Sequence, residues 1–438
     1  MANNTRLNKG YSGDTIRTFD KDGIKTPSVL LDIGGNVEEK LLTSHIVGIF
    51  SSLATHKRTS LINLKSIHGI SAFRDLVIQE NGGLVYHPGP NLSREYELSC
   101  SANALGKAIL ETAEYGKFQP GFAAEASIGV RIDYTNPLYP NQELKWGYCD
   151  QTGGFGFGVD SVGKFVYYGR EDTQWVKIYQ QNWSVDKMDG TGASGITLDL
   201  TKPHVYICQF FWYGFLSIEF IVMAIDPSTG DLRKYTVHRH VPSDTAMLID
   251  PNYPVSAKVL NHNANYPTPK LLVSFREFSV LGDFIPNERF TSAIRLNVPI
   301  NNTTWTPLSS WRKKANYESI AVSPIGFDML ANTDVRIIAF VNMTLNNPSW
   351  TDVTNTLPTE TALQMDIAST VDGTLATGAG YKIYGNIHSG AAKINETALS
   401  RETFEFNMAR GYTITFLART VSAANGTISF VPRFVEYW

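Results

Sequence analysis

The chain has 438 residues, which is long enough for two or three domains with separate hydrophobic cores. Its hydrophobic content of 43% argues against a disordered chain, and its aromatic content of 12% favours strands over helices. The net charge of −3 gives no global reason to expect nucleic acid or an anionic membrane as a partner, and the basic clusters at 56–58 and 312–314 are interpreted as solvated surface.

The N-terminal segment predicts an extended arm, which we place at 1–44. Residues 1–39 are polar and rich in glycine, and only 29–33 has the apolar character of a strand. Such a segment buries little surface of its own, so we expect it to lie against the main body or against a neighbouring molecule. The stretch 40–50 has plausible helical character.

The middle of the chain predicts a β-sandwich. The stretch 101–115 suits either a helix or a strand that leads into a loop. The apolar run 205–225 is interrupted by polar residues, so it predicts two consecutive buried strands and no membrane insertion. Turn residues separate the other strands at the spacing of a sandwich or jelly roll. We expect these strands at 122–132, 164–169, 173–179, 234–240, 255–260 and 271–280.

A change of pattern near 281–287 predicts a domain boundary. We therefore expect an all-β chain with two antiparallel β-sandwiches of jelly-roll or lectin-like type, one at 45–285 and one at 286–438. The strands expected in the second sandwich are 289–298, 317–324, 334–344, 381–387, 402–406, 413–418 and 426–437.

The histidines and cysteines predict no metal site. His238 and His240 share one face of a predicted strand, but the sequence identifies no third ligand that would complete a metal site. The three cysteines are too scattered for a disulfide framework or a zinc site, and we expect them to be free thiols, as in a reducing cytoplasm. They are Cys100, Cys149 and Cys208.

The acidic and glycine-rich motifs predict turns, with neither a catalytic residue nor a cofactor site. The run 153–158 alternates glycine with phenylalanine and opens no helix, so it does not predict a dinucleotide loop. Four aspartates beside glycines are interpreted as turn residues, and a calcium loop or a pair of glycosidase carboxylates is the alternative. They are Asp150, Asp160, Asp186 and Asp189.

Five aromatic residues form the candidate recognition surface. Planar rings with a polar edge suit the faces of sugars as well as protein interfaces. The alternative is that these rings fill the core of a sandwich. They are Trp146, Trp175, Trp183, Trp212 and Tyr213.

Two parts of the chain resemble the structural proteins of tailed-bacteriophage virions. The first is Asn8-Lys9-Gly10-Tyr11-Ser12-Gly13-Asp14-Thr15-Ile16, followed by Gly23-Ile24-Lys25 and Val29-Leu30-Leu31. It is similar to a leader that runs approximately N-P-G-x-G-G-D-x-I-A…G-V-K-x-x-x-V-x-L, with Lys9 in place of proline and Ser12 in place of a glycine. The second resembles a recurrent β-domain of the same proteins, and it comprises 146–157, 183–192, 197–201 and 211–214.

The resemblance implies a non-enzymatic virion protein of β-sandwich type, present in several copies. The first interpretation is a tail, baseplate or fibre-like component used in assembly or host attachment, and a capsid decoration or head-fibre protein is the alternative. A free lectin-like carbohydrate-binding module and, third, an enzyme that acts on host polysaccharide are the competing hypotheses. The expected partners are other virion proteins, further copies of the chain in a trimer, and a host-surface glycan.

The arm is the predicted attachment element. A strand at 29–33 would offer backbone groups that can extend a neighbouring sheet, and the glycines permit sharp turns across another surface. A self-docked arm or a disordered tail is the alternative. The residues assigned to the arm are Arg6, Asn8, Gly10, Gly13, Asp14, Ile16, Gly23, Lys25, Val29 and Leu31.

Overall fold

The computed structural model divides into two compact units, Met1–Thr55 and His56–Trp438. The backbone alone is described for four strands: β1 (Asn3–Arg6), β2 (Thr15–Lys21), β3 (Ile24–Ser28) and β27 (Asn395–Thr397). No helix among the described residues is long and apolar enough to cross a membrane. Beyond these four strands, the structure describes residues 58–89, 94–170, 175–212, 214, 216–240, 250–262, 265–282, 284, 287–353, 361–371, 380–388 and 407–438.

The first unit contains a three-stranded antiparallel sheet in the order β1-β2-β3. The sequence prediction, which placed a strand only at 29–33, missed these three strands. Lys21 pairs with Ile24, and the two residues between them are Asp22-Gly23, a dipeptide typical of β-hairpins. The predicted strand at 29–33 and the predicted helix at 40–50 lie outside the described residues.

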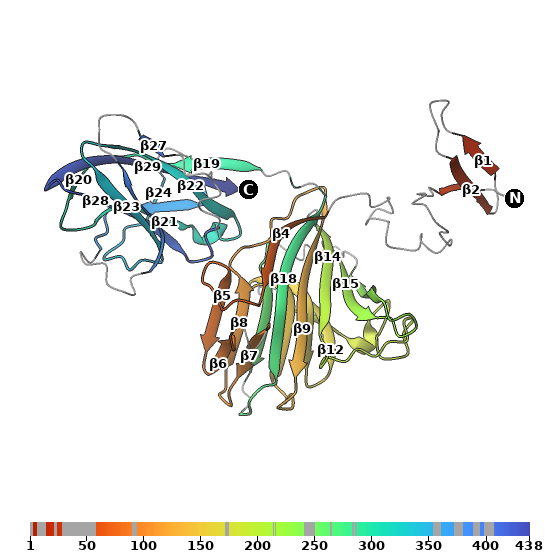
Figure 1. Cartoon of the computed structure of the whole chain (residues 1–438). Coiled ribbons are helices and arrows are strands. Elements are labelled where there is room, and N and C mark those ends of the chain that lie inside the picture. Colours follow the sequence, from red (N-terminus) through yellow and green to blue (C-terminus); the bar gives the residue numbers. More distant parts are fainter. Residues whose placement is uncertain are drawn as a thin grey trace. The chain divides into compact units, whose positions relative to one another are not determined.

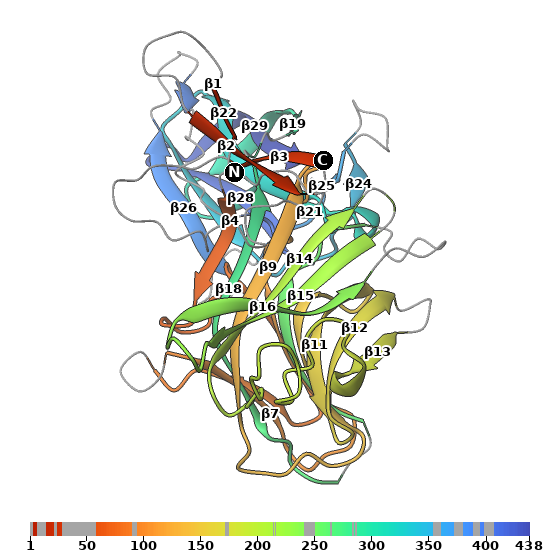
Figure 2. The ribbon, with the colours of Figure 1, turned by 90° about the vertical axis from the view of Figure 1, so that its right-hand side faces the viewer.

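Two antiparallel sheets form the first sandwich (Figures 1 and 2). The seven-stranded sheet has the order β13-β12-β11-β10-β17-β8-β5, and the eight-stranded sheet has the order β16-β15-β14-β9-β18-β7-β6, with β4 paired to β18. The strands of the seven-stranded sheet are β5 (Asp75–Glu80), β8 (Gly106–Thr112), β10 (Gln142–Cys149), β11 (Gly153–Asp160), β12 (Lys164–Arg170), β13 (Val176–Tyr179) and β17 (Val255–Asn261). Those of the other sheet are β4 (Arg58–Lys65), β6 (Gly83–Tyr86), β7 (Tyr96–Cys100), β9 (Ala123–Asp133), β14 (His204–Trp212), β15 (Leu216–Ile225), β16 (Leu232–His240) and β18 (Lys270–Leu281).

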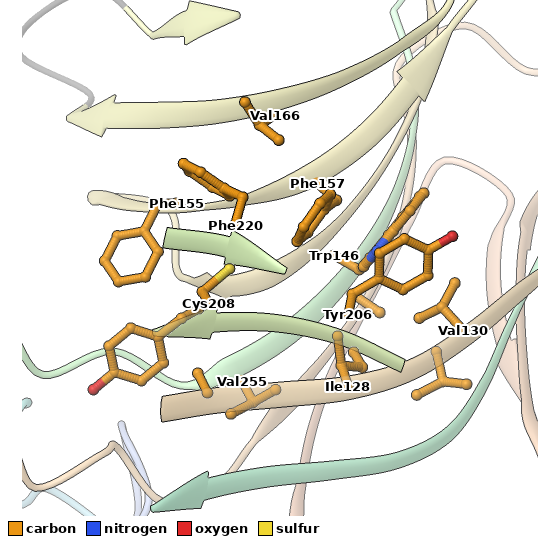
Figure 3. Packing of buried hydrophobic residues seen from close by; sticks show 14 of the residues in the cluster. Ile128, Val130, Trp146, Phe155, Phe157, Val166, Tyr206, Cys208, Phe220 and Val255 are labelled. Carbon is orange, nitrogen blue, oxygen red and sulfur yellow. The ribbon is translucent and has the colours of Figure 1, made fainter. Parts of the chain in front are cut away.

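The core of this sandwich is rich in aromatic rings. Successive side chains of a strand point to opposite faces, so every second residue of β10 and β11 reaches the core. Trp146 lies beside Tyr206 of the opposite sheet with 5.0 Å between ring centroids, and Phe157 is also 5.0 Å from Tyr206 (Figure 3). The buried rings therefore join the two sheets.

The second sandwich also consists of two antiparallel sheets. One has the order β19-β29-β22-β27 with β20 paired to β29, and the other has the order β24-β25-β21-β28-β23-β26. Trp311 packs on Phe434 in its core, with 4.8 Å between ring centroids. The remaining strands are β19 (Glu288–Ser292), β20 (Arg295–Asn301), β21 (Thr306–Lys313), β22 (Ala321–Ala331), β23 (Val335–Val341), β24 (Thr351–Asp352), β25 (Leu363–Asp366), β26 (Tyr381–His388), β28 (Thr413–Thr420) and β29 (Asn425–Tyr437).

The prediction of an all-β chain with two antiparallel sandwiches is confirmed, with corrections to single elements. The helical interpretation of 101–115 is wrong, because residues 106–112 form strand β8. Ala108 and Leu110 of this strand point into the core, and the residues between them point to the opposite face. The strand predicted at 289–298 is two strands, β19 and β20. The sequence pattern did not predict β21, β4 and β5, because serine, asparagine and charged residues interrupt the apolar residues of these strands.

A core substitution tests the packing of the first sandwich. Trp146→Ala should lower the free energy of unfolding by about 3–5 kcal/mol, because a buried ring is replaced by a cavity. Trp146 is 1% exposed, whereas Val162, which serves as the control in Val162→Ala, is 75% exposed. Chemical denaturation followed by fluorescence measures both, and equal losses in the two variants would contradict this packing.

Candidate functional site

The outer face of the seven-stranded sheet carries a second cluster of aromatic side chains. Leu144, Trp146 and Tyr148 of β10 point into the core, so Glu143 and Lys145 lie on the opposite face. The same alternation places two rings of β12, Tyr179 at the end of β13 and Trp175 just before β13 on this outer face, where Cys149 joins them. We call this surface the aromatic–carboxylate face, and it comprises Glu143, Lys145, Asp160, Phe165, Tyr167, Trp175, Lys177 and Tyr179.

Glycines of β11 make room for these rings. A Cβ atom on Gly158 would lie 2.5 Å from the ring of Phe165, so the ring occupies the space of the missing side chain. A Cβ atom on Gly156 would overlap the carbonyl group of Trp146 on the adjacent strand. Only glycine permits both approaches. The sequence motif of alternating glycine and phenylalanine therefore builds two surfaces, one in the core and one outside.

One ammonium group joins the two carboxylates of the face. The Nζ atom of Lys177 lies 2.7 Å from Glu143 Oε1 and 3.0 Å from Asp160 Oδ2. Lys145 Nζ lies 3.1 Å from Glu143 Oε2, and His262 Nε2 lies 3.7 Å from the same oxygen. Burial alone would raise the pKa of Glu143, but His262 and the two lysines outweigh it and lower the pKa to about 2.

The lysines also lie against the aromatic rings. Lys177 Nζ is 4.6 Å from the ring centroid of Phe165, and Lys145 Nζ is 5.1 Å from that of Tyr167 and 5.2 Å from that of Trp175. Such cation–π contacts hold the ammonium groups and the rings in fixed positions. Trp175 and Tyr179 are half-buried, and Lys177 is exposed. The face thus presents the rings of Trp175 and Tyr179 and the ammonium group of Lys177 to solvent, whereas Phe165, Tyr167 and Glu143 are buried.

The aromatic residues singled out in the sequence fall into different places. Trp146 and Trp183 lie in the core, which agrees with the core alternative for these two rings. Trp212 is half-buried and packs on Phe118 with 6.3 Å between centroids, and Tyr213 lies outside the described residues. Trp175 is the member of the set that reaches the aromatic–carboxylate face.

Most of the face was missed by the sequence analysis. The sequence pattern assigns no site role to Glu143, Lys145 or Lys177. It predicts Asp160 only as a turn residue. Asp160 does accept turn hydrogen bonds from the backbone N–H groups of Val162, at 2.9 Å, and Gly163, at 3.2 Å. Its second oxygen accepts one from the hydroxyl of Tyr179 at 3.0 Å. The signal that would have revealed the face is the alternation of charged and apolar residues along β10.

The other aspartates hold turns, as expected. Asp150 Oδ1 accepts hydrogen bonds from the N–H groups of Thr152, at 2.7 Å, and Gly153, at 3.2 Å. Asp186 accepts them from the N–H groups of Met188 and Ser194, and Asp189 from the N–H and hydroxyl groups of Thr191. Carboxylates that accept backbone N–H groups two or three residues ahead are the usual Asx turn.

The two histidines on β16 are buried against protein groups. His238 Nδ1 accepts a hydrogen bond from the N–H group of Ser184 at 3.1 Å, and the ring of His240 lies 4.2 Å from that of Tyr168. Burial lowers the pKa of both, and for His240 the charge of His238 lowers it further. Within the described part of the chain, no group of three histidine, cysteine or acidic residues is placed to hold a metal ion, and all three cysteines are free and buried.

A second polar cluster joins the two sandwiches. Lys258 Nζ donates a hydrogen bond to the carbonyl group of Asp150 at 2.6 Å and lies 3.7 Å from Glu111 Oε1. Arg410 of the second sandwich lies 2.6 Å from Glu318 and 4.0 Å from Asp150. Burial raises the pKa of Glu111, which is 2% exposed. We call these five residues the polar junction, and it fixes one end of the outer face.

Glu111 and Glu143 are too far apart to form the carboxylate pair that glycoside hydrolysis requires. Strand register places Glu111 opposite Ser256, which is opposite Gly147, so Glu143 is two strands and four residues away. At strand dimensions this separates their Cα atoms by roughly 17 Å, whereas catalytic pairs have carboxyl groups about 5–9.5 Å apart. Glu143 and Asp160 are closer, but a pKa of about 2 keeps Glu143 ionised at neutral pH. A carboxyl group with so low a pKa is poorly suited to act as a general acid at neutral pH.

Three arm residues are on described strands. Arg6 ends β1 opposite Thr15, Ile16 on β2 is opposite Thr5, and Lys25 on β3 is opposite Asp20. The other assigned arm residues lie outside the described part of the chain: Asn8, Gly10, Gly13, Asp14, Gly23, Val29 and Leu31.

Comparisons with known proteins give only weak structural likeness. No protein-family model and no curated protein matches the sequence. Similar solved structures include the endo-1,3-β-glucanase from Streptomyces sioyaensis, with 10% identity, coverage of 52% of this chain and 97% of that chain, and a TM-score of 0.34. Winged bean acidic lectin has 8% identity, 51% and 98% coverage and a TM-score of 0.32. The CBM2 module of the evolved Dit of Lactobacillus casei BL23 phage J-1 has 9% identity, 52% and 99% coverage and a TM-score of 0.30. Likeness at this level carries no conclusion about the activity of this chain.

The charge network of the face predicts a defined pH dependence. The folded-state pKa of Glu143, about 2, lies below its ordinary value of 4.5, so its stabilisation is present above pH 4.5 and is lost as pH falls toward 2. Glu143→Gln should lower the free energy of unfolding by about 1–3 kcal/mol at pH 7. The difference in the free energy of unfolding between this variant and the wild type should disappear between pH 5 and pH 2, as measured by urea denaturation. A gap of equal size at pH 7 and pH 2.5 would contradict this network.

Proposed function

We propose that the chain is a structural protein of a tailed-bacteriophage virion that binds a host-surface saccharide through its aromatic–carboxylate face. The observation that carries the binding proposal is the fixed set of half-buried rings and ion-paired charges on the outer face of the seven-stranded sheet. The leader at 8–31 and the block at 146–214 support the virion proposal by their resemblance to phage structural proteins.

The chemistry of the face suits a polyhydroxylated ligand. A sugar has an apolar ring face, which stacks on planar aromatic side chains such as Trp175, and hydroxyl groups, which both donate and accept hydrogen bonds. Asp160 can accept from such hydroxyls, and Lys177 can donate to them. The cation–π contacts and ion pairs fix these groups before a ligand binds, so little conformational entropy is lost on binding.

A binding role is favoured over hydrolysis. The ionised Glu143 supplies no acidic proton at neutral pH, and Glu111, whose pKa is raised, is buried in the polar junction away from the face. A binding surface needs neither a raised pKa nor a carboxylate pair. The positions and pKa shifts of Glu143 and Glu111 therefore support a non-enzymatic protein.

The N-terminal sheet supports a role in assembly. Among the described residues, β1 and β3 each have one edge that pairs with no other strand, and such edges can pair with a strand of another molecule. We infer that residues 1–44 attach the protein to the particle, in a homo-oligomer that we propose is a trimer. A tail, baseplate or fibre-like position is the preferred one, with a capsid decoration or head fibre as the alternative within the same class.

Loss of the half-buried Trp175 ring tests saccharide binding. Trp175→Ala should weaken binding to the best ligand on an array of bacterial cell-wall and capsular oligosaccharides by about tenfold or more, because a stacking contact is lost. The matched control is Phe290→Ala, which removes a ring that is 68% exposed in the second sandwich. Equal binding by the wild type and Trp175→Ala would show that the face is not the saccharide site.

Deletion of residues 2–39 tests the arm. The truncated protein should keep the thermal melting of both sandwiches but should fail to enter particles, because the attachment edges are removed. Quantitative mass spectrometry of purified particles measures the copy number. A free lectin-like module would be indicated if the full-length chain is absent from particles, and incorporation of the truncated chain at normal copy number would rule out the arm as the anchor.

A further inference from the structure

The second sandwich contains a pocket that the proposed function does not use. It has a volume of about 410 Å³, which falls in the range of small-ligand sites. Its walls come from the end of β21, the segment that follows β23, and the turn before β28. The residues that line it are Arg312, Lys313, Ala315, Glu318, Met343, Leu345, Pro348, Trp350, Gly411 and Thr413.

Arg312 is held in place by neutral groups. Its Nε and Nη2 atoms donate hydrogen bonds to the side-chain oxygen of Gln364 at 3.1 and 3.0 Å. Gln364 in turn donates from Nε2 to Asp352 at 3.1 Å, which fixes the orientation of its amide. The guanidinium group also lies 4.5 Å from the ring centroid of Trp350. Within the described part of the chain, no carboxylate lies within ion-pair distance of Arg312.

The charges that line the pocket leave this guanidinium uncompensated. Glu318 is already paired with Arg410, with 2.6 Å between Oε2 and Nε. Lys313 donates hydrogen bonds to the carbonyl groups of Glu318 and Ile320, so it supplies no negative charge to Arg312. A pocket with a fixed, unpaired guanidinium group favours an anion, and the planar fork suits a carboxylate in particular.

The remaining walls are apolar. Met343, Leu345, Pro348 and the ring of Trp350 line the pocket opposite a small number of polar groups. An inorganic anion would gain nothing from these walls, whereas a ring that carries a carboxylate would contact both parts of the site. A hexuronate ring has this combination of an apolar face and a carboxylate.

We propose that this pocket binds a uronate residue of an acidic polysaccharide, with the carboxylate on Arg312 and the sugar ring against Trp350. The site lies in a different sandwich from the aromatic–carboxylate face, so it does not depend on that proposal. The ligand can be a terminal residue or an internal residue of a chain, since both present the same carboxylate.

Calorimetric titration of the full-length protein tests the pocket. The probes are galacturonate and glucuronate, the neutral sugars galactose and glucose, and an oligogalacturonate. Wild-type protein should bind the uronates more tightly than the neutral sugars. Arg312→Gln should lower uronate affinity by about tenfold or more. The matched control Arg336→Gln also removes a guanidinium that lies on a tryptophan, Trp305, but outside the pocket, and it should bind like the wild type.

Additional measurements test the pocket if the first variant cannot be used. If Arg312→Gln does not fold, Trp350→Ala should weaken uronate binding severalfold because the ring contact is lost, and unchanged uronate binding by this variant would overturn the proposal. Tighter binding of the oligogalacturonate than of galacturonate identifies an internal residue as the ligand. Equal affinity for galactose and galacturonate, absence of binding to every uronate probe, or equal loss in Arg312→Gln and Arg336→Gln would each overturn the proposal. None of these results depends on Trp175.

Discussion

Glycine occupies every second position of β11, where a Cβ atom would meet the backbone of β10 or the ring of Phe165. Phe155 and Phe157 fill the core between those glycines, and Gly158 leaves the space in which the ring of Phe165 lies on the outer face. A side chain at these positions would meet either the neighbouring backbone or that ring. Residues 153–158 thus determine both the aromatic core of the sandwich and the position of the rings outside it.

The charges of the outer face are organised by that packing. Lys145 and Lys177 extend over the rings, and this places their ammonium groups on Glu143. At the other end of the face, the polar junction connects the sheet to the second sandwich through Arg410. A partly exposed surface whose groups are held by ion pairs and ring contacts is suited to recognition, because its geometry is set before a ligand arrives.

The sequence predicted the fold class and the central strands, but only part of the site. Alternation along 122–132 and 413–418 is strong, and these became β9 and β28. The hairpin of β2 and β3 was missed because its strands contain charged residues, although Asp22-Gly23 was present as a signal. Trp175 was identified from its residue type, whereas Glu143 and Lys177 become neighbours only when β10, β11, β12 and β13 pair in register. Register between strands depends on the whole sheet, so it could not be obtained from local pattern.

The central claim is that the aromatic–carboxylate face is the surface that meets the saccharide. Amine-reactive labelling with peptide mass spectrometry, with and without the host-surface polysaccharide, measures this on the intact protein. Lys177 has 32% of its side chain exposed, and Lys202, outside the face, has 73%. We expect the polysaccharide to protect Lys177 from labelling and to leave the labelling of Lys202 unchanged. Unchanged labelling of Lys177 at saturating polysaccharide would contradict it.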